Sequence, residues 1–181
     1  MSAPTLPAER LTTAPGDHAC AFYRGEAERR EILREFLGAG LAAGAPCLCI
    51  AGDADREWLA EELGPSELAV DSYAATYTHG GGFDREHMLG YWQAWGEAHG
   101  RGTRTASDMS WAEAAFGTPV LSEFMAYEAE TTALARQLDA TALCLYDLER
   151  LGRHVIIPAL RAHPVVLVSG VLVRNPYCEA R

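Results

Sequence analysis

The sequence predicts an α/β domain of three layers, in which helices cover both faces of a mostly parallel β-sheet. Two observations favour this fold class: short apolar runs of strand length alternate with amphipathic helical stretches, and some of these runs are apolar at every position. The chain has 181 residues, 49% of them hydrophobic, which is enough for one sizeable core. We expect a single domain over residues 16–181, preceded by a flexible leader of residues 1–15.

The first strand is expected over residues 17–23, a short run that carries a histidine, a thiol and a phenol. Because side chains alternate along a strand, His18 and Cys20 share one face and Tyr23 lies on the other. Apolar residues at helical spacing then predict an amphipathic helix over residues 26–43.

The next elements follow from the same signals. Residues 47–51 are apolar throughout and predict a strand covered on both faces. Asp53 is expected to cap a helix over residues 54–63, and a weaker strand follows over residues 68–73.

Three consecutive glycines, Gly80 to Gly82, predict a loop over residues 77–83. This loop is either a plain turn or the hinge of a mobile lid. Asp84 is expected to cap the following helix, which continues to about His99.

The second half of the chain repeats the pattern. Pro119 suits the first turn of a helix that continues over residues 120–138, and a further helix over residues 153–162 could begin instead at Pro158. The remaining strands are expected over residues 103–107, 141–146, 165–169 and 171–173.

Composition excludes several classes of function. The net charge is −10, the pI is near 5.0, and the 15 basic residues are scattered, which argues against direct nucleic-acid binding. The chain has neither an apolar run long enough to cross a bilayer nor a signal peptide, so we expect no membrane contact and a cytoplasmic location. Five cysteines, mostly within apolar runs, predict reduced thiols rather than disulfides.

Ligands of parallel α/β sheets collect at the carboxyl ends of the strands. This rule favours Tyr23, Asp53, Asp108 and Asp147. It disfavours His18, which lies at the amino end of its strand. The candidate mobile element is the segment Gly80 to Gly82.

The aromatic residues near loops and strand ends suit the wall of a small-ligand pocket. For Tyr23, Trp111, Tyr127 and Tyr146, pocket and core remain equal alternatives, whereas Trp92 and Trp95 are expected to fill the core. The candidate ligand-binding residues are His18, Cys20, Tyr23, Asp108, Trp111, Tyr127, Glu128, Tyr146 and Asp147. As a pair, Glu128 and Glu130 are better explained as part of a solvated helix face.

Two alternatives give the histidines and cysteines a chemical role. His18 and Cys20 could bind a transition metal or haem, with further ligands from Cys49, Cys144 or His163, although core thiols beside a hydrogen-bonded histidine explain the pattern better. An enzyme would use Cys20 or Cys144 with His163 and Asp147, but a cysteine in an apolar strand tends to be inert. We therefore expect no cofactor and no enzymatic activity.

Short motifs follow one another in a characteristic order from Gly16 onward: Asp17-His18-Ala19-Cys20-Ala21-Phe22-Tyr23, Gly82-Phe83-Asp84, Asp108-Met109-Ser110-Trp111, Tyr127-Glu128, Tyr146-Asp147, His163-Pro164 and Asn175-Pro176-Tyr177. Together they resemble the MEDS domain, the DcmR-type sensory family. The resemblance implies a RecA-like core that has lost nucleotide hydrolysis and senses a simple hydrocarbon derivative or other small organic ligand. It also implies relay of the signal to a regulatory protein partner, and self-association as a homo-oligomer would serve the same purpose.

The residues support the loss of hydrolysis independently. A phosphate-binding loop needs exposed backbone N–H groups, a lysine and a Ser or Thr for magnesium. Between its first strand and first helix this chain offers only Arg24-Gly25-Glu26-Ala27-Glu28, and the sequence contains neither Gly-Lys-Ser nor Gly-Lys-Thr.

Overall fold

The protein contains one seven-stranded sheet in the order β3-β2-β4-β5-β1-β6-β7. The structure is a computed structural model that describes residues 13–64, 68–115, 118–168 and 170–179. All neighbouring strands pair in parallel except β6 and β7, which are antiparallel. The strands are β1 (His18–Tyr23), β2 (Cys47–Ala51), β3 (Leu68–Ser72), β4 (Arg104–Asp108), β5 (Thr141–Asp147), β6 (Val165–Val168) and β7 (Val171–Arg174).

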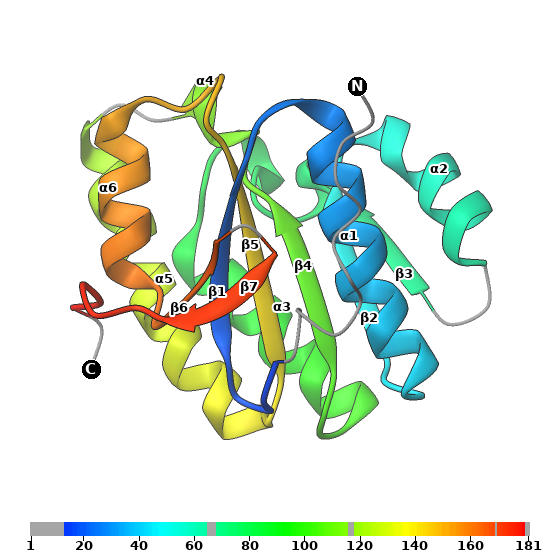
Figure 1. The fold of residues 1–181 in the computed structure, drawn as a ribbon. Helices are drawn as coiled ribbons and strands as arrows, with labels where there is room; N and C mark the ends of the chain where they lie inside the picture. The colour runs from blue at the N-terminus through cyan, green and yellow to red at the C-terminus, as the bar shows by residue number, and fades with distance from the viewer. Residues whose placement is uncertain (1–12, 65–67, 116–117, 169, 180–181) are drawn as a thin grey trace.

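Helices cover both faces of this sheet, so the expected three-layer α/β architecture is confirmed. In Figure 1, α1 and α2 lie on the near face, whereas α3 and α5 lie behind the sheet. The α-helices are α1 (Gly25–Ala42), α2 (Asp53–Leu63), α3 (Arg85–His99), α4 (Ala112–Ala115), α5 (Thr118–Leu138) and α6 (Arg153–Ala162).

The alternation of side chains along β1 divides the core into two parts. Ala19, Ala21 and Tyr23 pack with α1 and α2, whereas Cys20 packs with α3, α5 and α6. The strand Cys47–Ala51 is buried at all positions, as its uniformly apolar sequence predicts.

The N-cap residues of α2 and α3 can be compared with those that the sequence predicts. Asp84 caps α3, because its Oδ1 accepts the backbone N–H of His87 at 3.0 Å. The prediction for Asp53 was wrong: Gly52 is the N-cap of α2, and Asp53 is already the first residue of the helix. Pro158 lies inside α6 and does not start it.

The glycine loop folds into a turn. A short 3₁₀ helix, His79–Gly81, occupies it, and Gly80 and Gly81 have positive φ angles of 73° and 93°. These angles explain why glycine stands at both positions.

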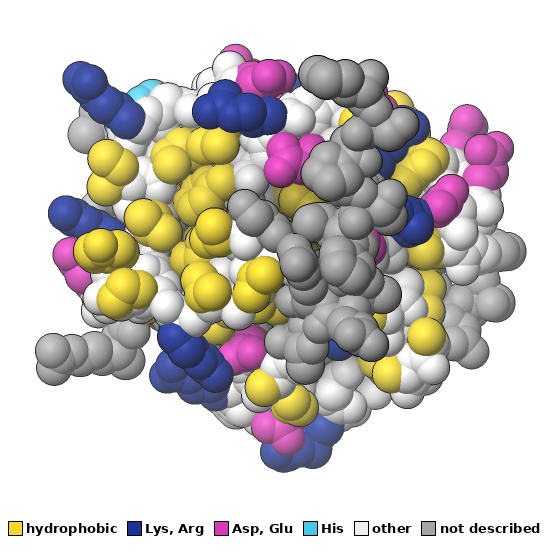
Figure 2. Space-filling model, viewed as in Figure 1, with side chains coloured by type: hydrophobic (Ala, Val, Ile, Leu, Met, Phe, Trp, Pro, Cys, Tyr) yellow, Lys and Arg dark blue, Asp and Glu magenta, His cyan; other side chains and the backbone are white. Residues whose placement is uncertain are grey.

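Exposed hydrophobic side chains gather over α6, β6 and β7 (Figure 2). They are Ile157, Val168, Val171 and Val173, with Tyr177 just beyond β7. Among the described residues, no helix has the length and hydrophobicity needed to cross a membrane. Most of the predicted leader, residues 1–15, lies outside the described part of the chain.

Candidate functional site

The structure divides the predicted site residues among three places. His18 and Glu128 lie in a buried polar cluster that also contains Cys144 and His163. Tyr127 lines a small aromatic cavity beside that cluster. Tyr23, Asp108 and Asp147 line an open pocket at the carboxyl edge of the sheet.

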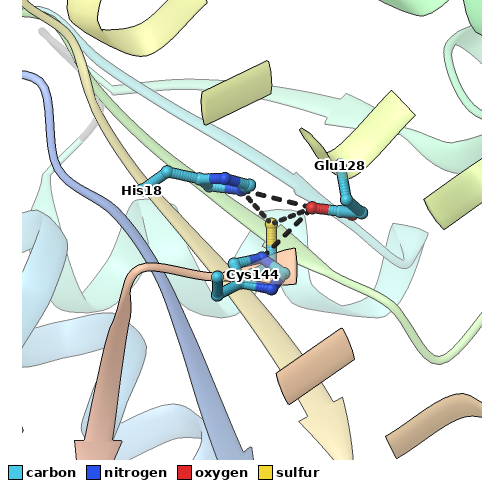
Figure 3. Close-up of side chains that lie close together, drawn as sticks. His18, Glu128 and Cys144 are labelled. Carbon is cyan, nitrogen blue, oxygen red and sulfur yellow. Dashed lines mark hydrogen bonds and ion pairs between the residues drawn. The ribbon is translucent and has the colours of Figure 1, made fainter. Parts of the chain in front are cut away.

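The buried cluster joins two strands to two helices. His18 begins β1, Cys144 lies on the neighbouring strand β5, Glu128 lies on α5, and His163 directly follows α6. Figure 3 shows His18, Glu128 and Cys144 converging, with Glu128 Oε2 at the centre of their contacts. This oxygen lies 3.2 Å from His18 Nε2, 3.1 Å from His163 Nε2 and 3.8 Å from Cys144 Sγ, while Cys144 Sγ lies 3.5 Å from His18 Nε2.

Burial determines the charges in this cluster. His18, Glu128 and His163 are fully buried, so the interpretation of Glu128 as part of a solvated face was wrong. Burial lowers the pKa of His18 to about 4, which leaves its imidazole neutral at pH 7. Burial alone would raise the pKa of Glu128, but the adjacent His163 and His18 lower it to about 2, so Glu128 is a carboxylate.

Hydrogen bonds fix the orientation of both rings and of the carboxylate. His163 Nδ1 lies 2.7 Å from the Ala159 carbonyl oxygen, which can only accept. His18 Nδ1 lies 2.9 Å from Thr132 Oγ1, whose own hydroxyl donates to the Glu128 carbonyl. Each ring therefore carries a proton on Nδ1 and turns Nε2 towards the cluster. Tyr146 donates to Glu128 Oε1 at 3.3 Å.

The other cysteines belong to the core. Cys20 shares the face of His18 but is not among the four clustered ligand atoms, and Cys49 packs in the layer beneath α1 and α2. Burial raises the pKa of the Cys20, Cys49 and Cys144 thiols, so all three are protonated at pH 7. The alternative catalytic set is not assembled, because Asp147 lies at the carboxyl edge, away from Cys144 and His163.

The aromatic cavity lies between β4, β5 and the helices α3 and α5. Its volume is about 30 Å³, and Tyr77, Trp92, Trp95 and Tyr127 form its aromatic wall. Tyr127 accepts a hydrogen bond from Trp92 Nε1 at 2.6 Å and contacts the Tyr77 hydroxyl at 3.2 Å. Trp111 stacks on Tyr77 from outside the cavity, at 4.9 Å between ring centroids.

Two polar atoms in this wall have no hydrogen-bond partner. Trp95 Nε1 and Thr103 Oγ1 are both buried, and both residues line the cavity. Unsatisfied buried groups are rare in folded proteins, because each costs about 1–3 kcal/mol. Trp92 and Trp95 were both expected to fill the core; Trp92 belongs to the core, Trp95 packs against it, and both also line this cavity.

The pocket at the carboxyl edge is polar and charged. Its volume is about 330 Å³, and Arg29 lies in it between Asp55 and Asp108, at 2.6 Å and 2.9 Å. Tyr23 donates to Asp108 at 3.2 Å. Asp147 accepts the backbone N–H of Glu149 at 2.8 Å, which is the contact of a turn-forming aspartate.

No loop suited to phosphate lies at this edge. β1 ends at Tyr23 and α1 begins at Gly25, so only Arg24 separates them. The first turn of α1 carries Glu26 and Glu28, and Glu28 Oε2 accepts the Arg24 backbone N–H at 2.7 Å. This geometry agrees with the sequence-based argument against triphosphate binding.

Sequence reasoning missed Arg29, Asp55, Trp95 and Thr103. The two charged residues lie on helices among other charged residues, so periodicity alone gave no signal for their burial. Thr103 directly precedes β4, on the amino side of the sheet, where the carboxyl-edge rule predicts no ligand.

Comparison with known proteins identifies the fold and the family. A KaiC-like protein from the hyperthermophilic archaeon Pyrococcus horikoshii OT3 has a similar structure, with a TM-score of 0.58 and 12% sequence identity over 84% of this chain and 70% of that chain. The similarity shows that the fold is RecA-like. No curated protein matches the chain significantly. The family described as the methanogen/methylotroph, DcmR sensory domain, MEDS, matches residues 17–164. The chain therefore belongs to the MEDS family of sensory domains.

Proposed function

We propose that this domain senses a very small, uncharged organic molecule, which binds in the aromatic cavity between α3, α5 and the sheet. The observation that carries the proposal is the small cavity whose lining residues include two unsatisfied polar atoms, Trp95 Nε1 and Thr103 Oγ1. Membership of a family of sensory domains supports the sensory role.

The size of the cavity limits the ligand. Its 30 Å³ is about a tenth of the smallest pockets that hold drug-sized molecules, which begin near 300 Å³. One water-sized probe needs about 10–15 Å³, so the cavity admits a molecule of only a few non-hydrogen atoms. One-carbon compounds such as methanol or a halogenated methane meet this limit.

The wall determines the polarity of the ligand. Among the residues that the structure describes, no charged side chain lines the cavity, and burying an unpaired ion there would be costly. An indole N–H can only donate, whereas a threonine hydroxyl can donate or accept. The preferred ligand is therefore neutral, with a small apolar part and one hydrogen-bond acceptor directed at Trp95.

Trp95 also suggests how a ligand enters. Its side chain lines both the aromatic cavity and a more open groove of about 570 Å³ that contains Pro46, Leu68 and His99. The indole stacks on His99 at 3.6 Å between ring centroids. Movement of Trp95 would connect the groove to the cavity. If α3 has two positions, one with Trp95 in place and one with Trp95 moved, a ligand that binds one of them better would raise the population of that state.

The test is binding of neutral one-carbon probes. Methanol and dichloromethane are titrated while the chemical shifts of the tryptophan indoles are followed by NMR, with charged methylammonium as the matched probe. We expect saturable shifts of the Trp95 indole resonance with a neutral probe only. The variant Ala135→Leu, which fills the cavity from α5, should abolish these shifts while the protein remains folded.

Two results would overturn the proposal. One is a Trp95 resonance that no neutral probe shifts, which would mean that the cavity holds water only. The other is equal binding to the wild type and to Ala135→Leu, which would place the ligand elsewhere, the carboxyl-edge pocket included.

For relay of the signal we propose self-association through β7. This strand ends the sheet, and its Val171 and Val173 are exposed. Antiparallel pairing of β7 with β7 of a second copy would satisfy the backbone N–H and C=O groups at the open edge of both chains. The two copies would then be related by a two-fold axis. Sedimentation velocity with and without methanol tests this, and Val173→Lys should leave a monomer. A wild type that stays monomeric in both conditions would exclude this route of relay.

A further inference from the structure

We propose that His18, Glu128, Cys144 and His163 form a resident zinc site that fastens α5 and the end of α6 to the sheet. Each residue offers one ligand atom, and the four atoms lie within 4.8 Å of one another. This site is separate from the aromatic cavity proposed for the organic ligand, although Cys144 contributes to both walls.

Four of the six distances between the ligand atoms match those around a tetrahedral zinc ion. With zinc bonds of about 2.0–2.1 Å to nitrogen and oxygen and about 2.3 Å to sulfur, a regular tetrahedron separates nitrogen from oxygen by about 3.3 Å and sulfur from either by about 3.5 Å. The observed nitrogen–oxygen distances are 3.2 Å and 3.1 Å, and the distances to sulfur are 3.5 Å and 3.8 Å.

The orientation of the ligands requires a cation among them. Both Nδ1 atoms are committed to oxygens outside the cluster, so both Nε2 atoms are directed at Oε2 of Glu128. An Nε2 atom without a proton can only accept, as the carboxylate oxygen does. His163 Nε2 in addition has no partner with hydrogen-bond geometry, although it lies 3.1 Å from that oxygen. Either a proton or a metal ion must lie between these atoms.

The charge of a zinc ion would be balanced within this site. Zn²⁺ would be neutralised by one carboxylate and by the Cys144 thiolate, which metal binding forms with release of a proton. The resulting site has no net charge, as a fully buried site should. Its ligand set of two imidazoles, one thiolate and one carboxylate is of the type that zinc prefers.

The surroundings resemble those of established zinc sites. Metal-bound histidines usually donate their second N–H to an oxygen, as His18 and His163 do towards Thr132 and Ala159. The ligating carboxylate is itself held by Tyr146. All four ligands are at most 5% exposed, which leaves no open position for substrate and indicates a structural rather than a catalytic ion.

The test uses Co²⁺ as a spectroscopic probe and Zn²⁺ as its competitor. The protein is unfolded with a chelator, refolded without metal and titrated with Co²⁺. We expect one Co²⁺ per chain, with the visible bands of tetrahedral cobalt and a thiolate charge-transfer band, and displacement by Zn²⁺. Protein that does not refold without metal is instead assayed as purified without metal affinity resin, where zinc at one per chain is the expected content.

Matched cysteine variants assign the site. Cys144→Ser should remove the thiolate band. Cys20 is the buried residue of β1 that pairs with Cys144, and Cys20→Ser should retain both the thiolate band and the ratio of one Co²⁺ per chain. Thr132→Val removes the hydroxyl that contacts His18 and donates to the Glu128 backbone carbonyl, and it should weaken Zn²⁺ binding about 10- to 100-fold. Circular dichroism shows whether each variant is folded.

Three outcomes would overturn the proposal. The first is folded wild-type protein that takes up neither ion, which would assign the cluster to a shared proton. The second is a thiolate band that survives in Cys144→Ser, and the third is one that is lost in a folded Cys20→Ser.

Discussion

Arg29 holds two carboxylates together at the carboxyl edge of the sheet. Its guanidinium contacts Asp55 at 2.6 Å and Asp108 at 2.9 Å, and the residue is 9% exposed. Removing one partner from such a buried network leaves its opposite charges uncompensated, which costs about 3–5 kcal/mol. Arg29→Leu should therefore lower the free energy of unfolding by about this amount in urea denaturation.

Arg34 provides the control on the same helix. It lies 3.7 Å from Glu62, both side chains are about two-fifths exposed, and such surface pairs contribute about 0–1 kcal/mol. Arg34→Leu should therefore be nearly neutral. Equal losses in the two variants would show that the buried ion pairs do not stabilise this edge.

The sequence showed the face of His18 but not its partners. Strand alternation placed His18 and Cys20 correctly, because that rule is local. Glu128 was misjudged because Glu130 stands two positions away on the same helix, and only tertiary packing decides which of the two is buried. The cysteine in the cluster is Cys144 and not Cys20, and tertiary structure decides this too, because it depends on the pairing of β1 with β5.

At the scale of elements, one glycine allows a close helix–sheet contact. A Cβ at Gly40 of α1 would lie 2.7 Å from both Cys47 Sγ and the Arg104 side chain, so helix and sheet would have to separate. Overpacking of this kind costs about 1–3 kcal/mol, which exceeds the gain of up to about 1 kcal/mol in helix propensity. Gly40→Ala should be destabilising in equilibrium urea unfolding.

Gly90 of α3 tests the same substitution without the contact. It is exposed, and a Cβ there would meet nothing within 4 Å. Gly90→Ala should stabilise the protein by about 0.5–1 kcal/mol, since alanine favours the helix. Changes of the same sign at both positions would contradict the role of packing at Gly40.

Element boundaries were predictable where a local signal is strong. The strand Cys47–Ala51 and the helix Arg153–Ala162 were predicted with the observed limits. The signals were uniformly apolar runs and the glycine and proline residues that interrupt them. The start of α2 was missed because Gly52 and Asp53 are both acceptable caps, and the sequence does not rank them. The short helix Ala112–Ala115 gave no periodic signal at all.

At the scale of the whole molecule, strand order lies beyond local sequence signals. The neighbours β1–β5 and β1–β6 join distant parts of the chain, and the order of the strands brings His18 beside Cys144 and places Tyr23 near Asp108. The family resemblance supplied the RecA-like arrangement that periodicity could not. It did not indicate the cavity beside Thr103, because the ligand rule for this fold refers to the opposite edge.

The RecA-like fold raises the question of nucleotide binding, and we expect none. Phosphate groups bind where a glycine-rich loop presents free backbone N–H groups at a helix start. Here Arg24 alone links β1 to α1, its N–H is already bound by Glu28, and Glu26 lies beside it in the first helical turn. Asp108 and Asp147 add further negative charge to the same pocket.

Isothermal titration with Mg-ATP should therefore give no binding heat, and the protein should release no phosphate above the buffer rate. The variant Glu26→Gln/Glu28→Gln separates the two causes. If charge repulsion alone excluded the nucleotide, this variant would gain measurable affinity, whereas a missing loop leaves it unable to bind. We expect the second result, because no glycine-rich backbone is available to replace the contacts of a phosphate loop. Saturable binding of Mg-ATP to the wild type would refute this account of the edge and restore the nucleotide as a candidate ligand.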